Sequence, residues 1–144
     1  MQSDILIAAA QPEHVPAIAA LEAACFSCPN TEDMICAHLE RYTAALKDGE
    51  VLGYSTVTSV LDECSLDNIA VLPACRRQGI ARLLMGAMIA DARQRKMACI
   101  RLEVRQSNVP AVTMYKQYGF RVDGVRKNYY TKPREDAILM TLVL

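Results

Sequence analysis

Apolar residues recur along the chain with two periods, and each period predicts one kind of element. From Cys99 to Arg105 apolar and charged residues alternate, with Ile100, Leu102 and Val104 on one side, which predicts a strand. After Gly79, apolar residues recur at positions 80, 83, 84, 87 and 88, which form one face of a helix from about residue 78 to 95. The two patterns meet only at element boundaries, so the chain divides clearly into strands and helices.

The same reasoning predicts the remaining elements. Further strands are expected at about residues 5–10, 43–47, 51–61, 65–72, 120–125 and 137–144, and further helices at about 12–26, 32–41 and 108–118. A polar loop that holds Asn128, Tyr129 and Tyr130 joins the last two strands. The order β-α-α-β-β-β-α-β-α-β-β predicts an α/β (α+β) fold, in which about four helices cover a mixed sheet of about seven strands.

Turn and cap residues mark several element boundaries. Asp48-Gly49 between two strands is a strong hairpin signal. Thr31, followed by two acids, predicts a helix N-cap with a charged first turn, and Ser107-Asn108 predicts another N-cap. Gly119 predicts a helix end, because glycine is common at the position just past a helix C-terminus.

Length and composition indicate one globular domain spanning residues 1–144. The chain is 52% hydrophobic, too apolar for a disordered segment. No apolar run approaches the ~20 residues that a membrane helix needs. The first residues lack the basic region and cleavage site of a signal peptide. We therefore expect a cytoplasmic protein with no membrane partner.

Charge is distributed unevenly, although the formal net charge is zero. Residues 1–73 carry eleven acidic and two basic residues, whereas residues 74–105 carry eight basic and two acidic ones. A zero total argues against general nucleic-acid binding. The acidic first half could attract a positively charged substrate, or these acids could simply form solvated faces.

The six cysteines are expected to be mostly small core residues. Cys25 and Cys28 form a Cys-x-x-Cys pair, but at the end of a predicted helix rather than at its start, where a thioredoxin-like motif belongs. A zinc site needs four ligands, and the two histidines have no matching spacing. We expect no metal, and a redox role remains a distant alternative.

The segment around Gly79 predicts a phosphate cradle. A short apolar run ends at Pro73, two arginines and a glycine follow, and a helix then begins. A helix N-terminus presents free N–H groups and the positive end of its dipole, and Gly79 lets an anion approach the backbone closely. Arg76 and Arg77 add positive charge. The alternative is a strand–loop–helix turn with no ligand, because Arg-x-x-Gly-x-Ala is a weak motif by itself.

Three polar residues downstream could carry chemistry. Glu103 lies on the predicted strand 99–105, while Asn108 and Tyr115 share one face of the next helix. Acyl transfer from a thioester to an amine needs a base toward the amine and an acid toward the thiolate. Each residue also has a structural interpretation: an ion pair of Glu103 with Arg101 or Arg105, a helix cap for Asn108, and a core aromatic for Tyr115.

Several motifs together resemble the GNAT acetyltransferases. The loop residues Arg76, Gly79 and Ala81 match the acyl-CoA-binding pattern Arg/Gln-x-x-Gly-x-Gly/Ala. The run from Leu102 to Asn108, with Ala111, Tyr115 and Tyr118-Gly119-Phe120, looks like the second signature of that family. The segment Asn68-Ile69-Ala70-Val71 and the tail Arg126 to Tyr130 with Arg134 to Met140 resemble the RimI-type ribosomal-protein alanine N-acetyltransferases.

The resemblance implies a GNAT fold with a splayed mixed sheet that binds acetyl-CoA between two central strands. It implies that the main chain of Ile69, Ala70 and Val71 holds the pantetheine and acetyl end, and that Asn108 touches the CoA arm. It assigns the pyrophosphate to the amides of the loop residues Arg76, Arg77, Gln78, Gly79, Ile80, Ala81 and Arg82. Glu103 is then the general base and Tyr115 the general acid of a direct transfer that needs no cysteine nucleophile.

The implied acceptor is a basic protein N-terminus, with the N-terminal alanine of a small-subunit ribosomal protein as the first hypothesis. Phe26, Tyr129 and Tyr130 are expected to contact this peptide. The family carries Pro-Trp after the phenylalanine, whereas Phe26 is followed by Ser27-Cys28-Pro29-Asn30 and the chain has no tryptophan. Two alternatives stay open: a GNAT enzyme for a small amine or lysine, and a non-catalytic acyl-CoA-binding module.

Overall fold

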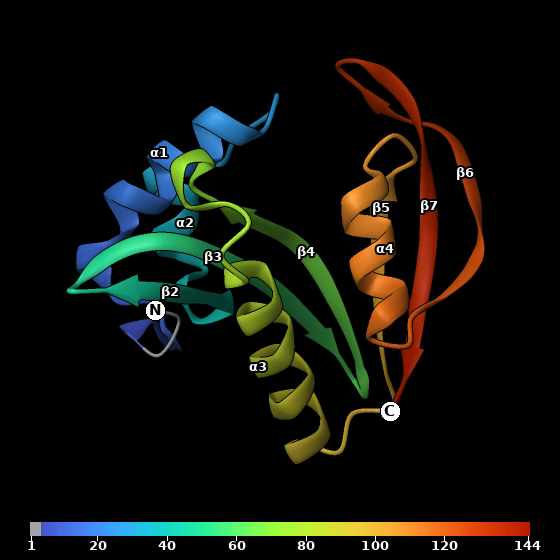
Figure 1. Ribbon diagram of the computed structural model, residues 1–144, viewed down its shortest axis with the longest axis horizontal. Helices are drawn as coiled ribbons and strands as arrows, with labels where there is room; N and C mark the ends of the chain where they lie inside the picture. The colour runs from blue at the N-terminus through green and yellow to red at the C-terminus, as the bar shows by residue number, and fades with distance from the viewer. Residues whose placement is uncertain (1–3) are drawn as a thin grey trace. The chain divides into compact units, whose positions relative to one another are not determined.

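The computed structural model describes residues 4–144 and contains seven strands and four α-helices within that range. Residues 1–3, part of the segment in which no signal peptide was predicted, lie outside the described residues. The strands are β1 (Leu6–Ala9), β2 (Tyr42–Lys47), β3 (Glu50–Val60), β4 (Glu63–Val71), β5 (Cys99–Arg105), β6 (Arg121–Thr131) and β7 (Arg134–Val143). The helices are α1 (Val15–Cys25), α2 (Glu32–Ala37), α3 (Ile80–Gln94) and α4 (Val109–Gln117), shown in Figure 1.

The strands form one mixed sheet in the order β1-β2-β3-β4-β5-β7-β6. β4 pairs in parallel with β5 from Glu63 opposite Cys99 to Leu66 opposite Leu102, while the other recorded pairs are antiparallel. β4 runs on to Val71 and β5 to Arg105, beyond the last residues that these two strands pair with each other. The predicted fold class, a mixed sheet of about seven strands with four helices, is confirmed.

The chain forms two compact units. The first unit holds residues 4–57 and 68–88, and the second holds residues 58–67 and 89–144. The first unit therefore contains α1, α2, the strands β1 and β2, most of β3, the end of β4 and the start of α3. That the whole chain forms a single domain stays a prediction.

Two apolar clusters lie on opposite faces of the sheet in the first unit. One cluster joins side chains of α1 and α2 to Ala44 and Ala70, and the other joins Ala45 to the first turns of α3. Neighbouring residues of a strand point to opposite faces, so Ala44 and Ala45 separate the two clusters. Ile69 and Val71 pack with the α3 cluster, so the end of β4 alternates between the two faces.

In the second unit, β7 lies between β5 and β6. It pairs with β5 from Ala137 opposite Arg105 to Val143 opposite Cys99. β6 continues to Thr131, so Tyr129 and Tyr130 belong to a strand, and the predicted polar loop at this position is wrong. The reason is a bulge, in which Asn128 adopts φ 55° and its N–H donates to Asp136 Oδ1 at 2.9 Å. A local irregularity thus interrupts the alternation while the strand goes on.

Several local predictions agree with the structure. Asp48 and Gly49 have φ values of 52° and 82°, as a tight hairpin turn requires. Thr31 Oγ1 accepts a hydrogen bond from Met34 N–H at 3.3 Å, so Thr31 is the N-cap of α2. Gly119 follows α4 with φ 101°.

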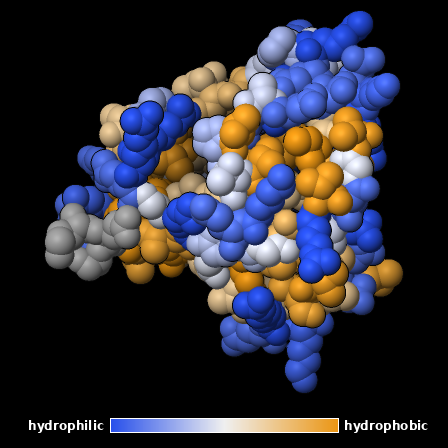
Figure 2. All heavy atoms as spheres, turned by 45° about the vertical axis from the view of Figure 1, so that its right-hand side comes forward, coloured by the Kyte–Doolittle hydropathy of each residue, from blue (hydrophilic) through white to orange (hydrophobic). Residues whose placement is uncertain are grey.

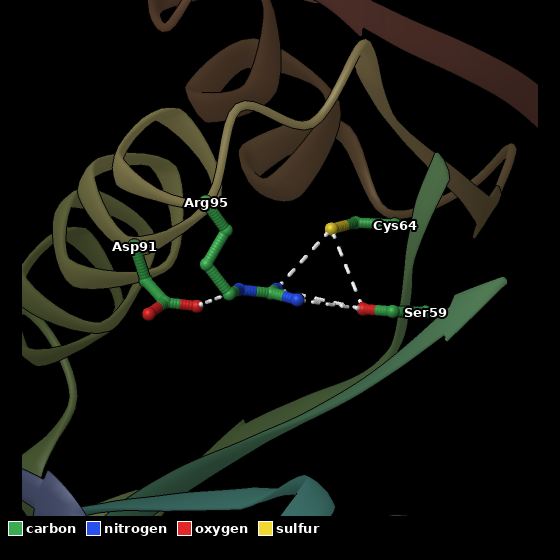
Figure 3. A network of polar contacts seen from close by, with 4 residues as sticks. All are labelled: Ser59, Cys64, Asp91 and Arg95. Atoms are coloured by element: carbon green, nitrogen blue, oxygen red, sulfur yellow. Dashed lines mark hydrogen bonds and ion pairs between the residues drawn. The ribbon is translucent and has the colours of Figure 1, made fainter. Parts of the chain in front are cut away.

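A polar network ties the end of α3 to β3 and β4 within the second unit (Figure 3). Arg95 Nε donates to Asp91 Oδ2 at 2.9 Å, and the guanidinium also reaches Ser59 Oγ at 3.4 Å and Cys64 Sγ at 3.5 Å. Cys64 and Cys99 are buried, but Cys28 and Cys36 are exposed. Cys25 and Cys75 are half-buried and pack against the two core clusters, so four of the six cysteines lie in or against a core, as predicted.

The displayed surface mixes apolar and hydrophilic side chains (Figure 2). The exposed large apolar residues include Val122 and Val125 on β6 and Val143 at the end of β7. β6 is the last strand of the sheet order, and charged residues interrupt its apolar positions, which protects an exposed edge. Within residues 4–144 no helix is both long and apolar enough to cross a membrane.

Candidate active site

The predicted phosphate loop connects β4 to α3 in the first unit. A short 3₁₀ turn at Pro73–Cys75 is followed by Arg77 and Gly79, whose φ values are 66° and 79°. The first helical hydrogen bond runs from Leu83 N–H to the Gly79 carbonyl at 3.0 Å. The amides of Ile80 and Ala81 precede it in the first turn of α3, where an α-helix leaves its N–H groups without helical partners. This geometry suits an anion such as pyrophosphate.

Arg76 folds back onto the end of β4. Its Nε donates to the Val71 carbonyl at 3.3 Å, and its Nη2 lies 3.7 Å from Cys25 Sγ. The side chain thus braces the loop against the strand and α1. The Val71 carbonyl thus accepts one hydrogen bond from the loop that follows it.

A glycine allows the close packing of β3 against the end of β4. A Cβ at Gly53 would lie 2.8 Å from the Ala70 carbonyl oxygen and 3.4 Å from Val71 Cα. It would also lie 3.3 Å from Ile80 Cγ2, in the first turn of α3. Gly53 therefore supports both segments that were predicted to hold acetyl-CoA.

In the second unit, Glu103 is exposed on β5 and lies between two arginines that pair elsewhere. Arg101 Nε is 2.9 Å from Glu63 Oε1, and Arg105 Nη1 is 3.3 Å from Glu135 Oε1. None of the ion pairs among the described residues includes Glu103. The structural interpretation of Glu103 as the partner of a neighbouring arginine is thus not what the structure shows.

Tyr115 is a buried phenol near a second tyrosine. Its side chain is 4% exposed, and burial, with a smaller contribution from Tyr130, raises its pKa to about 12. Burial, followed by Tyr129 and Glu103, likewise raises the pKa of Tyr130 to about 12. Tyr130 therefore lies close enough to Glu103 and to Tyr115 to interact electrostatically with each, and both phenols keep their protons at neutral pH.

Arg105 holds Tyr130 in place, a role that the sequence analysis did not find. The guanidinium carbon lies 4.3 Å from the centre of the Tyr130 ring, and the side chain donates to the carbonyls of Lys132 and Pro133 at 3.2 and 3.0 Å. The only signal in the sequence was the position of Arg105 two residues after Glu103. Arg105 points to the same side of β5 as Glu103, but no neighbouring residue in the sequence connects it to Tyr130.

The other predicted residues have well-defined positions. Asn108 is the N-cap of α4, and its Oδ1 accepts from Ala111 N–H at 3.3 Å. Phe26 is half-buried and packs on the core cluster of α1 and α2. Tyr129 is 42% exposed and meets Tyr130 edge-on with ring centres 5.0 Å apart. Among the described residues, no group of three His, Cys, Asp or Glu side chains is placed to hold a metal ion.

The fold and these groups define a class of enzyme. The mixed seven-stranded sheet carries an anion cradle after β4, and the carboxylate and phenols on β5, α4 and β6 can exchange protons with a substrate. A cradle for a CoA pyrophosphate and an acid–base pair suit acyl transfer from a thioester to an amine. The class is that of the CoA-dependent acyltransferases with the GNAT fold.

Comparison with known proteins agrees with this class. The family model described as Acetyltransferase (GNAT) family matches residues 9–120. A Bacillus subtilis protein, provisionally named a ribosomal protein bS18-alanine N-acetyltransferase, is 33% identical over 92% of this chain and 91% of its own length. The Escherichia coli ribosomal protein bS18-alanine N-acetyltransferase is 42% identical over 67% of this chain and 66% of its own.

The crystal structure of the ribosomal-protein-S18-alanine N-acetyltransferase from Escherichia coli superimposes with a TM-score of 0.87. That chain is 35% identical, and the superposition covers 96% of this chain and 93% of the other. The present chain therefore belongs to the GNAT acetyltransferase family. It is an acetyl-CoA-dependent N-acetyltransferase.

Proposed function

We propose that this enzyme acetylates the free α-amine of an N-terminal alanine on a small-subunit ribosomal protein. The names of its Bacillus subtilis and Escherichia coli relatives support this substrate. The observation in this chain that supports the proposal is that Arg101 and Arg105 pair with other acids and leave the Glu103 carboxylate, near Tyr130, available as a base. Such a substrate places the enzyme in the cytoplasm.

The first unit binds acetyl-CoA in this proposal. The main-chain amides from Arg76 to Arg82 hold the pyrophosphate, and the positive φ of Arg77 and Gly79 turns the loop around it. The main chain of Ile69, Ala70 and Val71 holds the pantetheine and acetyl end. The resemblance assigns a contact with the CoA arm to Asn108, whose Oδ1 also caps α4.

The second unit supplies the proton transfers. The amine nitrogen attacks the thioester carbonyl carbon, a C–N bond forms and the C–S bond breaks. Glu103 removes the amine proton through a water molecule, and Tyr115 donates its proton to the departing sulfur and later regains one from solvent. Because its pKa is raised to about 12, Tyr115 is in the protonated form that a general acid needs at neutral pH.

The acceptor peptide is held by Tyr129, Tyr130 and the loop after Phe26. Tyr130 is half-buried between Arg105 and Tyr129, so one part of its ring is fixed and the rest can meet a peptide. An α-amine with a pKa near ~8 is partly neutral at pH 7, whereas a lysine amine near ~10.4 is almost fully charged. An exposed carboxylate that acts as a base through water is therefore better suited to an α-amine than to a lysine amine.

A thiol-release assay with acetyl-CoA tests the reaction and its acceptor. Three acceptors separate the possibilities: a short basic peptide with a free N-terminal alanine, its N-terminally blocked twin carrying an internal lysine, and a polyamine. We expect release with the free-alanine peptide alone. Release only with the blocked peptide or the polyamine would refute the proposed acceptor and leave the chemistry in place. Acetyl-CoA binding without release would indicate a non-catalytic module.

Two isosteric variants test the proton transfers. Glu103→Gln and Tyr115→Phe should each lower kcat by about 10²–10⁴-fold, with little change in acetyl-CoA affinity. Glu40→Gln, which makes the same chemical change at an exposed acid, serves as the control and should behave like the wild type. Unchanged turnover of Glu103→Gln would remove this residue from the mechanism. Full activity of Tyr115→Phe would mean that water protonates the thiolate.

A further inference from the structure

One acid of the first unit is buried in the apolar core. Glu22 lies on α1 beside Leu21 and is 1% exposed, among the core side chains that face β2 and β3. Position 22 continues the stripe formed by Val15 and Ile18 at helical spacing, which is why an acid there becomes buried. A buried carboxylate is costly unless hydrogen bonds satisfy its oxygens, so its partners explain why it is tolerated.

Three donors from three segments converge on the Glu22 carboxylate. Tyr54 Oη on β3 donates to Oε2, the Asn30 main-chain N–H donates to Oε1 at 2.9 Å, and Asn68 Nδ2 on β4 donates to Oε2 at 3.4 Å. Burial, and then the contact with Glu22, raises the pKa of Tyr54, so this phenol stays a donor. The carboxylate accepts from all three, an arrangement that a neutral side chain of the same size cannot reproduce.

These partners connect the two segments that bind the acceptor and the acetyl group in the proposed function. Asn30 belongs to the loop after Phe26, which is proposed to border the acceptor, and its Nδ2 also donates to Tyr42 Oη at 3.3 Å. Asn68 directly precedes Ile69, where the proposed acetyl-binding main chain begins. Glu22 itself touches neither substrate in this arrangement and acts through its neighbours.

We propose that Glu22 is a positioning residue that fixes the loop at residues 27–31 relative to the end of β4, and thereby sets the acceptor against the thioester. The inference rests on one part of the proposed function, namely that this loop borders the acceptor. Stability alone gives no reason for a carboxylate here, because buried charges contribute little net stability compared with well-packed apolar residues. What the carboxylate adds is a geometry that holds a loop, a tyrosine and a strand at once.

Glu22→Gln tests the inference, because it keeps the volume and removes one acceptor oxygen. The KM for the acceptor should rise by about ten- to one-hundred-fold, as expected for the loss of hydrogen bonds to a charged group. The dissociation constant of acetyl-CoA should stay within about twofold, since the phosphate loop lies outside this network. Tyr54→Phe removes one donor and keeps the ring, so it should shift the acceptor KM in the same direction by less. Glu40→Gln is the matched control.

Hydrogen exchange provides a readout that needs no acceptor. In Glu22→Gln the amides of the loop, Asn30 above all, should exchange about tenfold faster or more, while the α3 amides keep their protection. If the wild type acetylates none of the offered acceptors, the proposed function fails, and this exchange measurement alone decides whether Glu22 fixes the loop. A polyamine or lysine acceptor that the wild type does use would replace the peptide in the KM comparison.

Three results would overturn the inference. Unchanged exchange in the loop would show that Glu22 does not hold it. Faster exchange with an unchanged acceptor KM would show that the held loop does not position the acceptor. Equal losses of acetyl-CoA affinity, acceptor affinity and melting temperature would show a purely structural role in the core.

Discussion

Two glycine-to-alanine variants should have opposite effects, for reasons that can be read from the space around each residue. At Gly53 a Cβ would lie 2.8 Å from the Ala70 carbonyl oxygen, so β3 and the end of β4 must separate by about 0.6 Å to reach an ordinary contact of 3.4 Å. At Gly86 in α3 no atom other than those of its chain neighbours and its own helix backbone lies within 4 Å of the new Cβ. The two variants therefore make the same chemical change in a crowded and in an open place.

The expected magnitudes follow from packing and helix propensity. Overpacking of this kind costs about 1–3 kcal/mol, so Gly53→Ala should lower the melting temperature by about 2–12 °C. Gly86→Ala replaces a glycine in a helix interior and should stabilise the protein by about 1 kcal/mol, which raises the melting temperature by about 2–4 °C.

The assay is thermal unfolding of both variants with and without acetyl-CoA, together with calorimetric titration of acetyl-CoA. Gly53→Ala displaces Ala70 and crowds Ile80, which belong to the proposed acetyl and pyrophosphate segments, so it should also weaken acetyl-CoA binding. Gly86→Ala should leave that affinity unchanged. A Gly53→Ala protein with the stability and affinity of the wild type would refute the argument that this close approach supports the cofactor segments.

Three further predictions concern the second unit. The rate with an alanine peptide should rise as the α-amine loses its proton near pH ~8 and then stay level, because the pKa of Tyr115 is about 12 and this phenol stays protonated. A kcat that falls as the pH is raised toward 10 would contradict this. Asn108→Ala should lose about 0.5–2 kcal/mol of stability in urea unfolding, whereas Asn108→Ser keeps a cap and should weaken only acetyl-CoA binding. Wild-type acetyl-CoA affinity of Asn108→Ser would argue against a CoA contact. Arg105→Ala and Arg105→Lys should both raise the peptide KM, because lysine cannot stack on Tyr130 and pair with Glu135 in the same way; full rescue by lysine would refute the stacking argument.

The sequence by itself determined the features that depend on a few neighbouring residues. The alternation of residues 99–105 predicted the bounds of β5, Asp48-Gly49 predicted the hairpin turn, and Thr31 predicted the N-cap of α2. The strand, basic loop and helix around Gly79 were likewise visible, because a positive φ and a helix start are local properties. Family resemblance rested on these same local motifs.

Only the tertiary structure decided which distant residues meet. Alternation could not show that Arg101 and Arg105 find Glu63 and Glu135 and leave Glu103 unpaired, because those partners come from other strands. Pairing with β7 keeps Tyr130 in a strand despite the bulge before it. Hydrophobic periodicity places a residue on a helix face, but it contains no information on the hydrogen-bond donors opposite that face. For this reason Glu22, satisfied by three remote segments, became visible only in the folded chain.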